Sequence, residues 1–477
     1  MNNQTRREFL KTAGLSTASI AAPLLLAGCD TPARAAPRAS PDRDAFRQKP
    51  NIVFVLADDL GYGDLGCYGR QDIKTPVIDR MAAEGVRFTQ YYANGPECSP
   101  TRTAFLTGRY QHRVGGLECA IGTGNVGRYD DAIRLRETHD LGLPVEETSI
   151  ARMLKDAGYA TAITGKWHLG YEPKFAPHLH GFDHAFYCIG GGMDYFHYLD
   201  TVAGYNLFLN GDPIRREGHF TDLATDEAIK FIERHADGPF FLYVPYTAPH
   251  SPFQGPDDYR PDPLPLDSPL WKQGQAPPDV YVAMIEHMDK CIGRILKVLD
   301  DKGLTQDTVV IFSSDNGGTG SARNAPLSKI KGSTFEGGIR VPAVARRPGV
   351  IPKGVVNEQV CITMDFSASI VRIAGATVPP GREFDGLDIL KLVETGRPPR
   401  KRTLFWRGRR GDRTWRAVRD GDLKYIRRTD GGRTEEYLFD LKEDVGETRS
   451  LLEERPEEVR RLKAMLADWE KEVRHPR

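Results

Sequence analysis

The sequence predicts an α/β fold: a large mixed, mostly parallel sheet sandwiched by helices, plus a small C-terminal antiparallel sheet with a terminal helix. Three observations lead to this fold class. Several apolar, β-branched runs lack the polar alternation of half-exposed strands, which is typical of strands covered on both faces. Segments with apolar residues at helical spacing lie between those runs. After about residue 398 the chain changes to short strand-like runs separated by turn signals.

Length and composition exclude several classes of protein. The 477 residues suit one large domain and one smaller domain. The 65 basic and 65 acidic side chains cancel, so no global charge favours binding to nucleic acid or to an acidic membrane. The seven cysteines show neither a disulfide framework nor paired zinc-ligand spacing. The sequence leaves open the oligomeric state and any disulfides among Cys67, Cys119, Cys188, Cys291 and Cys361.

Residues 1–36 are interpreted as an export signal and not as part of the fold. A twin-arginine motif, Thr-Arg-Arg-Glu-Phe-Leu-Lys, begins at Thr5, and an apolar stretch follows at residues 13–28. That stretch is shorter and more polar than a membrane-spanning helix. It ends in Leu-Ala-Gly-Cys, which resembles a bacterial lipoprotein box with Cys29 as the lipidated residue. The alternative is cleavage after Ala35, which leaves a soluble protein.

Residues 37–50 form a Pro/Ala/Arg-rich tether that is too polar to pack. We therefore expect the twin-arginine translocase to export this protein from a bacterial cytoplasm. The expected destination is the periplasm or the cell surface, and the one expected membrane contact is a lipid anchor at Cys29 if the lipoprotein box is used. Residues 51–398 form the predicted main domain, and residues 399–477 form a C-terminal α+β subdomain.

Four strand-like runs each end shortly before residues that can bind a metal ion or take part in catalysis. Because ligands bind beyond the carboxyl ends of parallel strands, we expect these four groups to share one edge of the sheet. The runs are residues 51–57 before Asp58 and Asp59, 159–164 before Lys166 and His168, 240–244 before His250, and 308–312 before Asp315 and Asn316.

The connecting segments have recognisable helix and loop patterns. Residues 148–157 predict a helix that stops at Gly158, and residues 281–299 predict a longer amphipathic helix. His287 lies within that longer helix and is interpreted as an ordinary helix residue. Residues 251–278 are rich in proline and polar residues, which indicates a long surface loop.

The C-terminal region predicts a small antiparallel sheet. Asp420-Gly421 separates the strand-like residues 415–418 and 424–427, and this dipeptide is a strong hairpin signal. Residues 437–439 add a strand. A helix with one apolar face follows Pro456 and covers the sheet.

Asp58, Asp59, Asp315 and Asn316 form a donor set of hard oxygen ligands without imidazole or thiolate. That composition suits calcium or magnesium and disfavours zinc or copper. A single aspartate after a strand more often caps a turn or helix. Two such pairs at equivalent strand ends favour a site for one divalent cation.

Cys98 opens the run Cys-Ser-Pro-Thr-Arg, which continues to Leu-Thr-Gly-Arg at Arg109. The segment predicts the start of a helix, and Arg102 then lies one turn beyond Cys98, so both can face one site. A soft sulfur is a mismatched ligand beside a hard cation, which disfavours an unmodified cysteine there. The structural alternative for Cys98 is a buried thiol.

These segments, in this order, resemble the formylglycine-dependent type I sulfatases of the alkaline-phosphatase-like superfamily, such as arylsulfatases and N-acetylgalactosamine-6-sulfatases. The resemblance runs from Asn51 to the terminal helix, which makes residues 51–398 the catalytic domain. It implies that a formylglycine-generating enzyme oxidises Cys98 to an aldehyde. It also implies that the four oxygen ligands hold one cation, usually calcium, which a hydroxyl of the hydrated aldehyde at position 98 can bind as well.

The resemblance also implies roles for the remaining residues. Arg102 would position the modified residue, and Lys166 and Lys331 would bind sulfate oxygens. His168 would contact the formylglycine hydroxyls and assist proton transfer, and His250 would donate a proton to the leaving oxygen. The Lys-Gly register favours Lys331 over Lys329, which precedes it by two residues.

The reaction that follows is hydrolysis of a sulfate ester by S–O cleavage. A sulfated carbohydrate is the expected substrate because an exported enzyme meets polymers outside the cell. Its pocket walls are expected from residues 110–144, 178–219 and 251–278. One alternative is a phosphate or phosphonate ester hydrolase of the same superfamily. The other is an inactive exported protein that binds glycans.

Overall fold

The structure is a computed structural model that describes residues 49–122, 124–201 and 204–474. The twin-arginine motif, Cys29 and all but the last two residues of the tether lie outside the described residues. No helix within the described ranges combines the length and the apolarity needed to cross a membrane.

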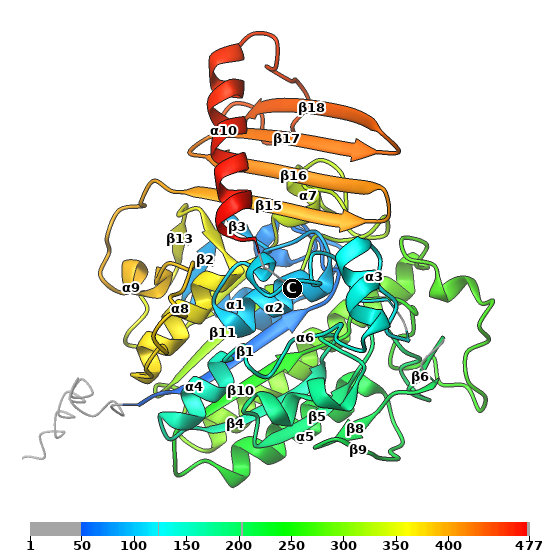
Figure 1. Ribbon diagram of the computed structural model, residues 1–477. Helices are drawn as coiled ribbons and strands as arrows, with labels where there is room; N and C mark the ends of the chain where they lie inside the picture. The colour runs from blue at the N-terminus through cyan, green and yellow to red at the C-terminus, as the bar shows by residue number, and fades with distance from the viewer. Residues whose placement is uncertain (1–48, 123, 202–203, 475–477) are drawn as a thin grey trace, which may run out of the picture. The chain divides into compact units, whose positions relative to one another are not determined.

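A ten-stranded mixed sheet forms the centre of the fold, in the order β13-β2-β12-β11-β1-β10-β4-β5-β8-β9 (Figure 1). Its five central strands run parallel: β11 (Thr308–Ser314), β1 (Asn51–Ala57), β10 (Phe240–Pro245), β4 (Ala160–Lys166) and β5 (His184–Cys188). Antiparallel pairings at both sides make the sheet mixed. The outer strands are β12 (Ala343–Arg346), β2 (Val86–Phe88), β13 (Val355–Asn357), β8 (Phe208–Leu209) and β9 (Asp212–Pro213).

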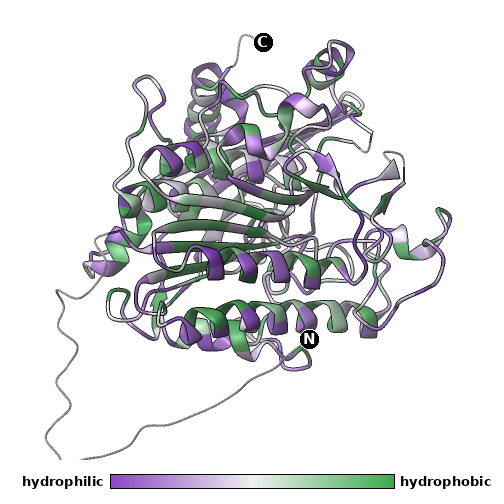
Figure 2. Cartoon of the chain, turned by 90° about the horizontal axis from the view of Figure 1, so that it is seen from below, coloured by the Kyte–Doolittle hydropathy of each residue, from purple (hydrophilic) through white to green (hydrophobic). Residues whose placement is uncertain are grey.

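Helices cover both faces of this sheet. Alternate residues of β1 belong to two separate hydrophobic cores, one on each face, so the strand is apolar throughout. Figure 2 shows largely hydrophobic strands beside helices that mix hydrophobic and hydrophilic turns. One core includes α2 (Cys98–Thr107), α3 (Asp130–Glu137), α4 (Ile150–Asp156), α8 (Thr363–Ala374) and α9 (Ile389–Glu394). The other includes α1 (Pro76–Ala83), α5 (Phe220–Arg234) and α6 (Pro278–Asp301).

A four-stranded antiparallel sheet and a final helix complete the chain, as Figure 1 shows in orange and red. Apolar residues of α10, such as Leu462 and Trp469, share a core with Trp406 of the sheet and with Tyr92 of the main domain. The elements are β15 (Thr403–Arg410), β16 (Arg413–Asp420), β17 (Leu423–Asp430), β18 (Arg433–Asp440) and α10 (Pro456–Glu472). This sheet and helix, with the large mixed sheet, confirm the predicted fold class.

Short elements connect these layers. They are the strand pairs β3 (Tyr91–Tyr92) with β14 (Cys361–Ile362) and β6 (Leu199–Asp200) with β7 (Gly204–Tyr205), the short helix α7 (Glu336–Ile339), and the 3-10 turns η2 (Gly66–Tyr68), η3 (Gln111–Arg113), η4 (Pro173–Phe175), η5 (Pro177–His180) and η6 (Pro269–Trp271). The predicted loop at 251–278 is irregular apart from η6.

Two strands extend further than the sequence predicts. β4 includes Lys166 as its last residue, and β11 continues to Ser314, directly before Asp315. The four groups of chemical residues therefore lie at the carboxyl ends of adjacent parallel strands, as expected. The six cysteines of the described residues are free thiols, so none of them forms a disulfide within this chain.

Candidate active site

The floor of the site consists of residues that follow two neighbouring parallel strands. Pairing of β1 with β11 sets Ala57 against Ser314, so the next residues of both strands are adjacent. The Asp315 backbone N–H donates to the Ala57 carbonyl at 3.1 Å. The Asn316 side-chain amide donates to Asp59 Oδ1 at 2.7 Å. Asp58, Asp59, Asp315 and Asn316 are all buried, which gathers three carboxyl groups in a volume with little solvent.

Cys98 and Arg102 reach this floor from the first two turns of α2. The Cys98 thiol lies 3.4 Å from Asp58 Oδ1. One turn later, Arg102 donates through Nε and Nη2 to Asp315 Oδ2 at 3.0 and 2.8 Å, and Nη2 also lies 3.2 Å from Asp58 Oδ2. A fourth bond runs from Nη1 to the Lys166 carbonyl at 3.0 Å. The helix start thus presents both residues to one site, as the sequence predicts.

Two lysines add positive charge from opposite sides. The Lys166 ammonium pairs with Asp58, and both side chains are fully buried. The Lys331 ammonium lies 2.7 Å from Asp59 Oδ1 and 3.7 Å from Cys98 Sγ. Lys329 instead places its ammonium 5.8 Å from the centre of the Phe335 ring. The structure therefore brings Lys331, and not Lys329, to the acidic floor.

His168 is held in an uncommon backbone conformation, with φ of 55°. Its Nε2 lies 2.8 Å from the Ile121 carbonyl, which fixes the proton on Nε2. Nδ1 is buried and has no hydrogen-bond partner among the described residues. Burial, and then the positive charge of Lys166, holds the pKa of His168 well below its usual range. His168 is therefore a neutral imidazole with one unused acceptor.

His250 is oriented by its own loop. Its Nδ1 donates to the Ser251 carbonyl at 2.5 Å, and its Nε2 lies 2.9 Å from the Gln273 amide nitrogen and 3.7 Å from Asp59 Oδ2. Burial lowers the pKa of His250 to about 4, and the positive charge of Lys331 acts in the same direction. Gln273 lies in the long loop before α6, and no pattern in its local sequence predicted that it would be a site residue.

The charges around Cys98 keep its thiol protonated. Burial, followed by the carboxylates of Asp315 and Asp58, raises the pKa of Cys98 well above its usual value. Burial also acts to raise the pKa of Asp58, but the neighbouring cations, Lys166 foremost, outweigh it and lower that pKa. A neutral buried thiol is a weak nucleophile, because the thiolate is the reactive form.

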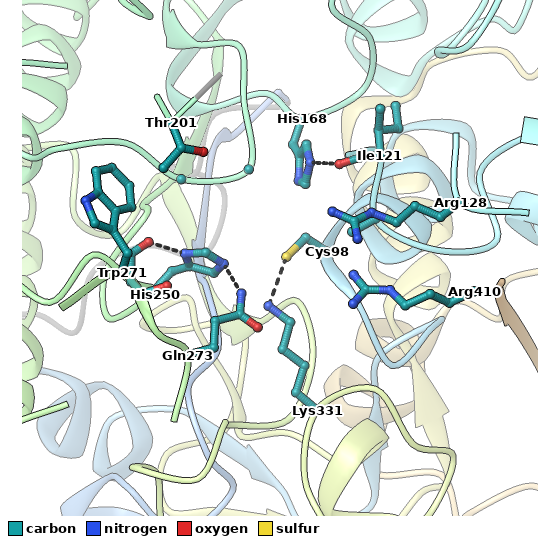
Figure 3. Close-up of a pocket in the computed structure, with 14 residues that line it drawn as sticks. Cys98, Ile121, Arg128, His168, Thr201, His250, Trp271, Gln273, Lys331 and Arg410 are labelled. Carbon is teal, nitrogen blue, oxygen red and sulfur yellow. Dashed lines mark hydrogen bonds between the residues drawn. The ribbon is translucent and has the colours of Figure 1, made fainter. Parts of the chain in front are cut away.

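A cavity of about 300 Å³ opens above this floor (Figure 3). As the sequence predicts, three chain segments line it: 120–128, 191–201 and 250–273. Arg410, at the end of β15, also lines it, and sequence reasoning missed this contribution of the C-terminal sheet. Its lining residues are Cys98, Ala120, Ile121, Arg128, His168, Gly191, Gly192, Thr201, His250, Ser251, Trp271, Gln273, Lys331 and Arg410.

The donor atoms beside Cys98 fit a hard divalent cation. One ligand atom each of Asp58, Asp59, Cys98 and His250 lies within 4.8 Å of the others. Asn316 adds an amide oxygen that is buried and accepts no hydrogen bond from the described residues. His250 was not expected in this cluster. The predicted ligand Asp315 lies beside it and accepts a hydrogen bond from Arg102 through Oδ2. Carboxylate and amide oxygens are the ligands that calcium and magnesium prefer.

Buried ammonium and guanidinium groups around a candidate cation site suit an enzyme that binds an anionic ester. The sulfatase family model matches residues 50–376. The chain is 36% identical to the N-acetylgalactosamine-6-sulfatase of Canis lupus familiaris over 383 residues, which covers 76% of this chain and 69% of that protein. It is 30% identical to human steryl-sulfatase over 429 residues, with 72% and 70% covered.

The solved structure of Ps i-CgsB in complex with k-i-k-neocarrahexaose superposes with a TM-score of 0.75 at 28% identity, covering 88% of this chain and 93% of that one. The chain therefore belongs to the sulfatase family and is a type I sulfatase of the alkaline phosphatase superfamily. Its reaction class is sulfuric ester hydrolysis.

Proposed function

We propose that the sulfate ester cleaved by this enzyme belongs to a carbohydrate and that Cys98 acts after oxidation to formylglycine. The observation that carries this proposal is the position of Cys98, 3.4 Å from Asp58 and 3.7 Å from Lys331. Its neutral thiol is unsuited both to nucleophilic attack and to a hard cation. The hydrate of formylglycine supplies two hydroxyl groups at this position, one to attack sulfur and one to restore the aldehyde.

One divalent cation completes the proposal. When bound, it lowers the pKa of a hydroxyl group and offsets negative charge on the sulfate. Calcium is the proposed ion, with magnesium as the alternative that the same oxygen ligands accept. The ligands would be Asp58, Asp59, Asp315 and Asn316, with position 98 contributing a hydroxyl oxygen after modification.

The remaining groups have roles that follow from their contacts. Lys166 and Lys331 approach the floor from two sides, so their ammonium groups can bind two sulfate oxygens as charge builds in the transition state. Arg102 holds the carboxylates of Asp58 and Asp315 in place. These three cations bind and position without transferring a proton.

Two histidines divide the proton transfers. In its protonated form, His250 gives the Nε2 proton to the alcohol oxygen as the S–O bond breaks, while Nδ1 stays bonded to Ser251. Rotation of the Gln273 amide lets its oxygen accept from that protonated Nε2. His168 accepts, through its unpartnered Nδ1, the proton that the second hydroxyl loses as sulfate departs. The attacking hydroxyl would release its proton to solvent before the attack, because the bound cation would lower its pKa.

Relatives support a carbohydrate substrate. N-acetylgalactosamine-6-sulfatases match this chain at 36% identity, and the structure of Ps i-CgsB holds k-i-k-neocarrahexaose. The cavity wall carries arginine, tryptophan and amide side chains, which suit sugars with anionic groups.

A desulfation screen on defined sulfated mono- and oligosaccharides tests the substrate class. The protein is co-expressed with a formylglycine-generating enzyme, and matched aryl sulfate and aryl phosphate esters are run beside the sugars. Release of sulfate from sugars by wild type, and its loss in Cys98→Ala, supports the proposal. Lys331→Ala is expected to lose most activity, with Lys329→Ala as its matched control. Faster turnover of the aryl phosphate than of the matched aryl sulfate contradicts the proposed sulfatase function.

Export is the second part of the proposal. The twin-arginine motif and the lipoprotein box in residues 1–36 favour export of a folded, already modified enzyme, anchored through Cys29 at the periplasmic or outer surface. Fractionation of cells that express the full chain, with radiolabelled fatty acid, tests both points. Labelling that Cys29→Ala abolishes supports the anchor, and an unlabelled enzyme in the cytoplasm contradicts export.

A further inference from the structure

One wall of the active-site cavity carries a charged group that the mechanism above does not use. Arg128 lies in the segment before α3 and lines the cavity together with Cys98 and His168. Figure 3 shows its guanidinium pointing from that wall toward the middle of the cavity. The side chain is half-buried, and its Nε is buried without a hydrogen-bond partner among the described residues.

Within the described ranges, no carboxylate forms an ion pair with Arg128. The other arginine of the cavity lining and its lysine do have such partners. Arg410, on the same wall in Figure 3, lies 3.2 Å from Glu97 Oε1, and Lys331 lies 2.7 Å from Asp59 Oδ1.

A partly desolvated cation without a counter-ion costs free energy that a bound anion can offset. A guanidinium matches sulfate and carboxylate groups because its planar fork can donate two parallel hydrogen bonds. The proposed mechanism places the scissile sulfate between Lys166 and Lys331. An anion on Arg128 would then be a second group of the same substrate.

The opposite wall offers groups that suit the sugar itself. Figure 3 shows Trp271, Gln273 and Thr201 across the cavity from Arg128. The Trp271 indole N–H donates to the Pro265 carbonyl at 3.0 Å, which fixes the ring as one side of the cavity. At about 30 Å³ per liquid water molecule, the cavity has the volume of about ten waters. That volume holds a sugar ring as well as its sulfate.

We propose that Arg128 binds a second anionic group of the substrate, carried by the sulfated sugar or by the sugar next to it. The substrate class is then a glycan with at least two anionic groups near each other. This inference rests on the proposed carbohydrate sulfatase function and adds a specificity-determining residue to it. A second sulfate and a uronate carboxylate share the required chemistry, and the experiment distinguishes them.

The test compares kcat/KM for three sugar substrates with one scissile sulfate each: a monosulfated sugar, its disulfated counterpart, and the monosulfated sugar linked to a uronic acid. Wild type is expected to prefer at least one dianionic substrate by about tenfold, the worth of one charge-assisted contact. Arg128→Ala is expected to remove most of that preference, and Arg128→Lys to retain part of it. The preferred dianionic substrate identifies the second group as sulfate or carboxylate.

Arg410→Ala is the matched control, because it removes a guanidinium from the same wall that Glu97 already neutralises. It is expected to keep most of the preference for the dianionic substrate. If Arg128→Ala slows all three substrates equally, or leaves the preference intact, the inference is wrong although the proposed function stands. If wild type desulfates none of the sugars but cleaves aryl sulfates, the carbohydrate proposal itself fails. Melting temperatures of the variants show whether they fold.

Discussion

Arg102 and Asp315 form a fully buried ion pair in which two guanidinium donors meet one carboxylate oxygen, at 3.0 Å from Nε and 2.8 Å from Nη2. The pair joins the second turn of α2 to the residue that follows β11. Arg102 also lies 3.2 Å from Asp58. This one side chain therefore contacts the carboxylates that follow β1 and β11, and it fixes how far α2, which carries Cys98, lies from those two strands. The geometry of the site thus depends on a contact at its base.

Replacement of Arg102 by alanine is therefore expected to destabilise the protein as well as inactivate it. Removal of one partner from a buried pair leaves uncompensated charge, at a cost of about 3–5 kcal/mol. Urea unfolding measures this cost. Arg460→Ala, which removes an exposed arginine from α10, is the control and is expected to change the unfolding free energy by less than about 0.5 kcal/mol. Equal stability of Arg102→Ala and wild type would contradict the structural role.

Gly191 is expected to be essential for the position of His168. A Cβ atom at Gly191 would lie 2.8 Å from His168 Cε1, so Gly191→Ala must displace the imidazole. Misplacement of a catalytic group is costly, and we expect kcat to fall by at least about tenfold. Gly238→Ala is the matched control because a Cβ there meets no atom within 4 Å. Steady-state kinetics measure kcat of the two variants and of wild type. An unchanged kcat in Gly191→Ala would show that His168 has room to move or no role in turnover.

Calcium is expected to bind the chelator-treated protein and to raise its melting temperature, since a ligand that binds only the folded state stabilises it. Asn316→Ala removes the one buried amide oxygen without a hydrogen-bond partner in the described part of the site and should weaken binding at least about tenfold. Calorimetric titration measures the affinity without reference to catalysis. Asn357→Ala in β13 is the control. A melting temperature insensitive to calcium and magnesium alike would rule out the cation site.

His287 is expected to make stability depend on pH far from the active site. Burial acts to lower the pKa of His287, but its hydrogen bond to Asp222 at 2.8 Å, with Cys291 nearby, raises that pKa to about 9. A raised pKa in the folded state means that the protonated pair stabilises the fold below about pH 6.5. That contribution is lost as the pH rises through about 9.

The unfolding free energies of wild type and His287→Gln, measured in urea between pH 6 and 10, check this dependence. The difference between them is expected to shrink between about pH 6.5 and about pH 9 and to change little above that. A difference that stays constant with pH would mean that His287 is not protonated in the folded protein.

The acidic floor could be predicted from the sequence because Asp58 and Asp315 directly follow strands, Lys166 ends one, and parallel strands share a carboxyl edge. Asp58, Lys166 and Asp315 are therefore expected together from local patterns alone. Pairing of the described cysteines is excluded only by the structure.

Contributions from distant segments could not be predicted. Arg410 reaches the cavity because the C-terminal sheet packs on the main domain through Trp406 and Tyr92, and no local pattern encodes that packing. Gln273 contacts His250 from an irregular loop, whose path depends on tertiary contacts rather than on periodicity. The strand β15 was also not predicted from the sequence, because its arginines interrupt the apolar pattern of its buried face.

The chemical state of residue 98 tests the central claim most directly. Mass spectrometry of the tryptic peptide spanning residues 88–102, from protein co-expressed with a formylglycine-generating enzyme, measures the fraction of aldehyde at that position. We expect sulfatase activity to rise in proportion to this fraction and to be absent in Cys98→Ala, which keeps the wild-type melting temperature within a few degrees. Full activity in a preparation whose residue 98 is entirely an unmodified thiol would contradict the central claim.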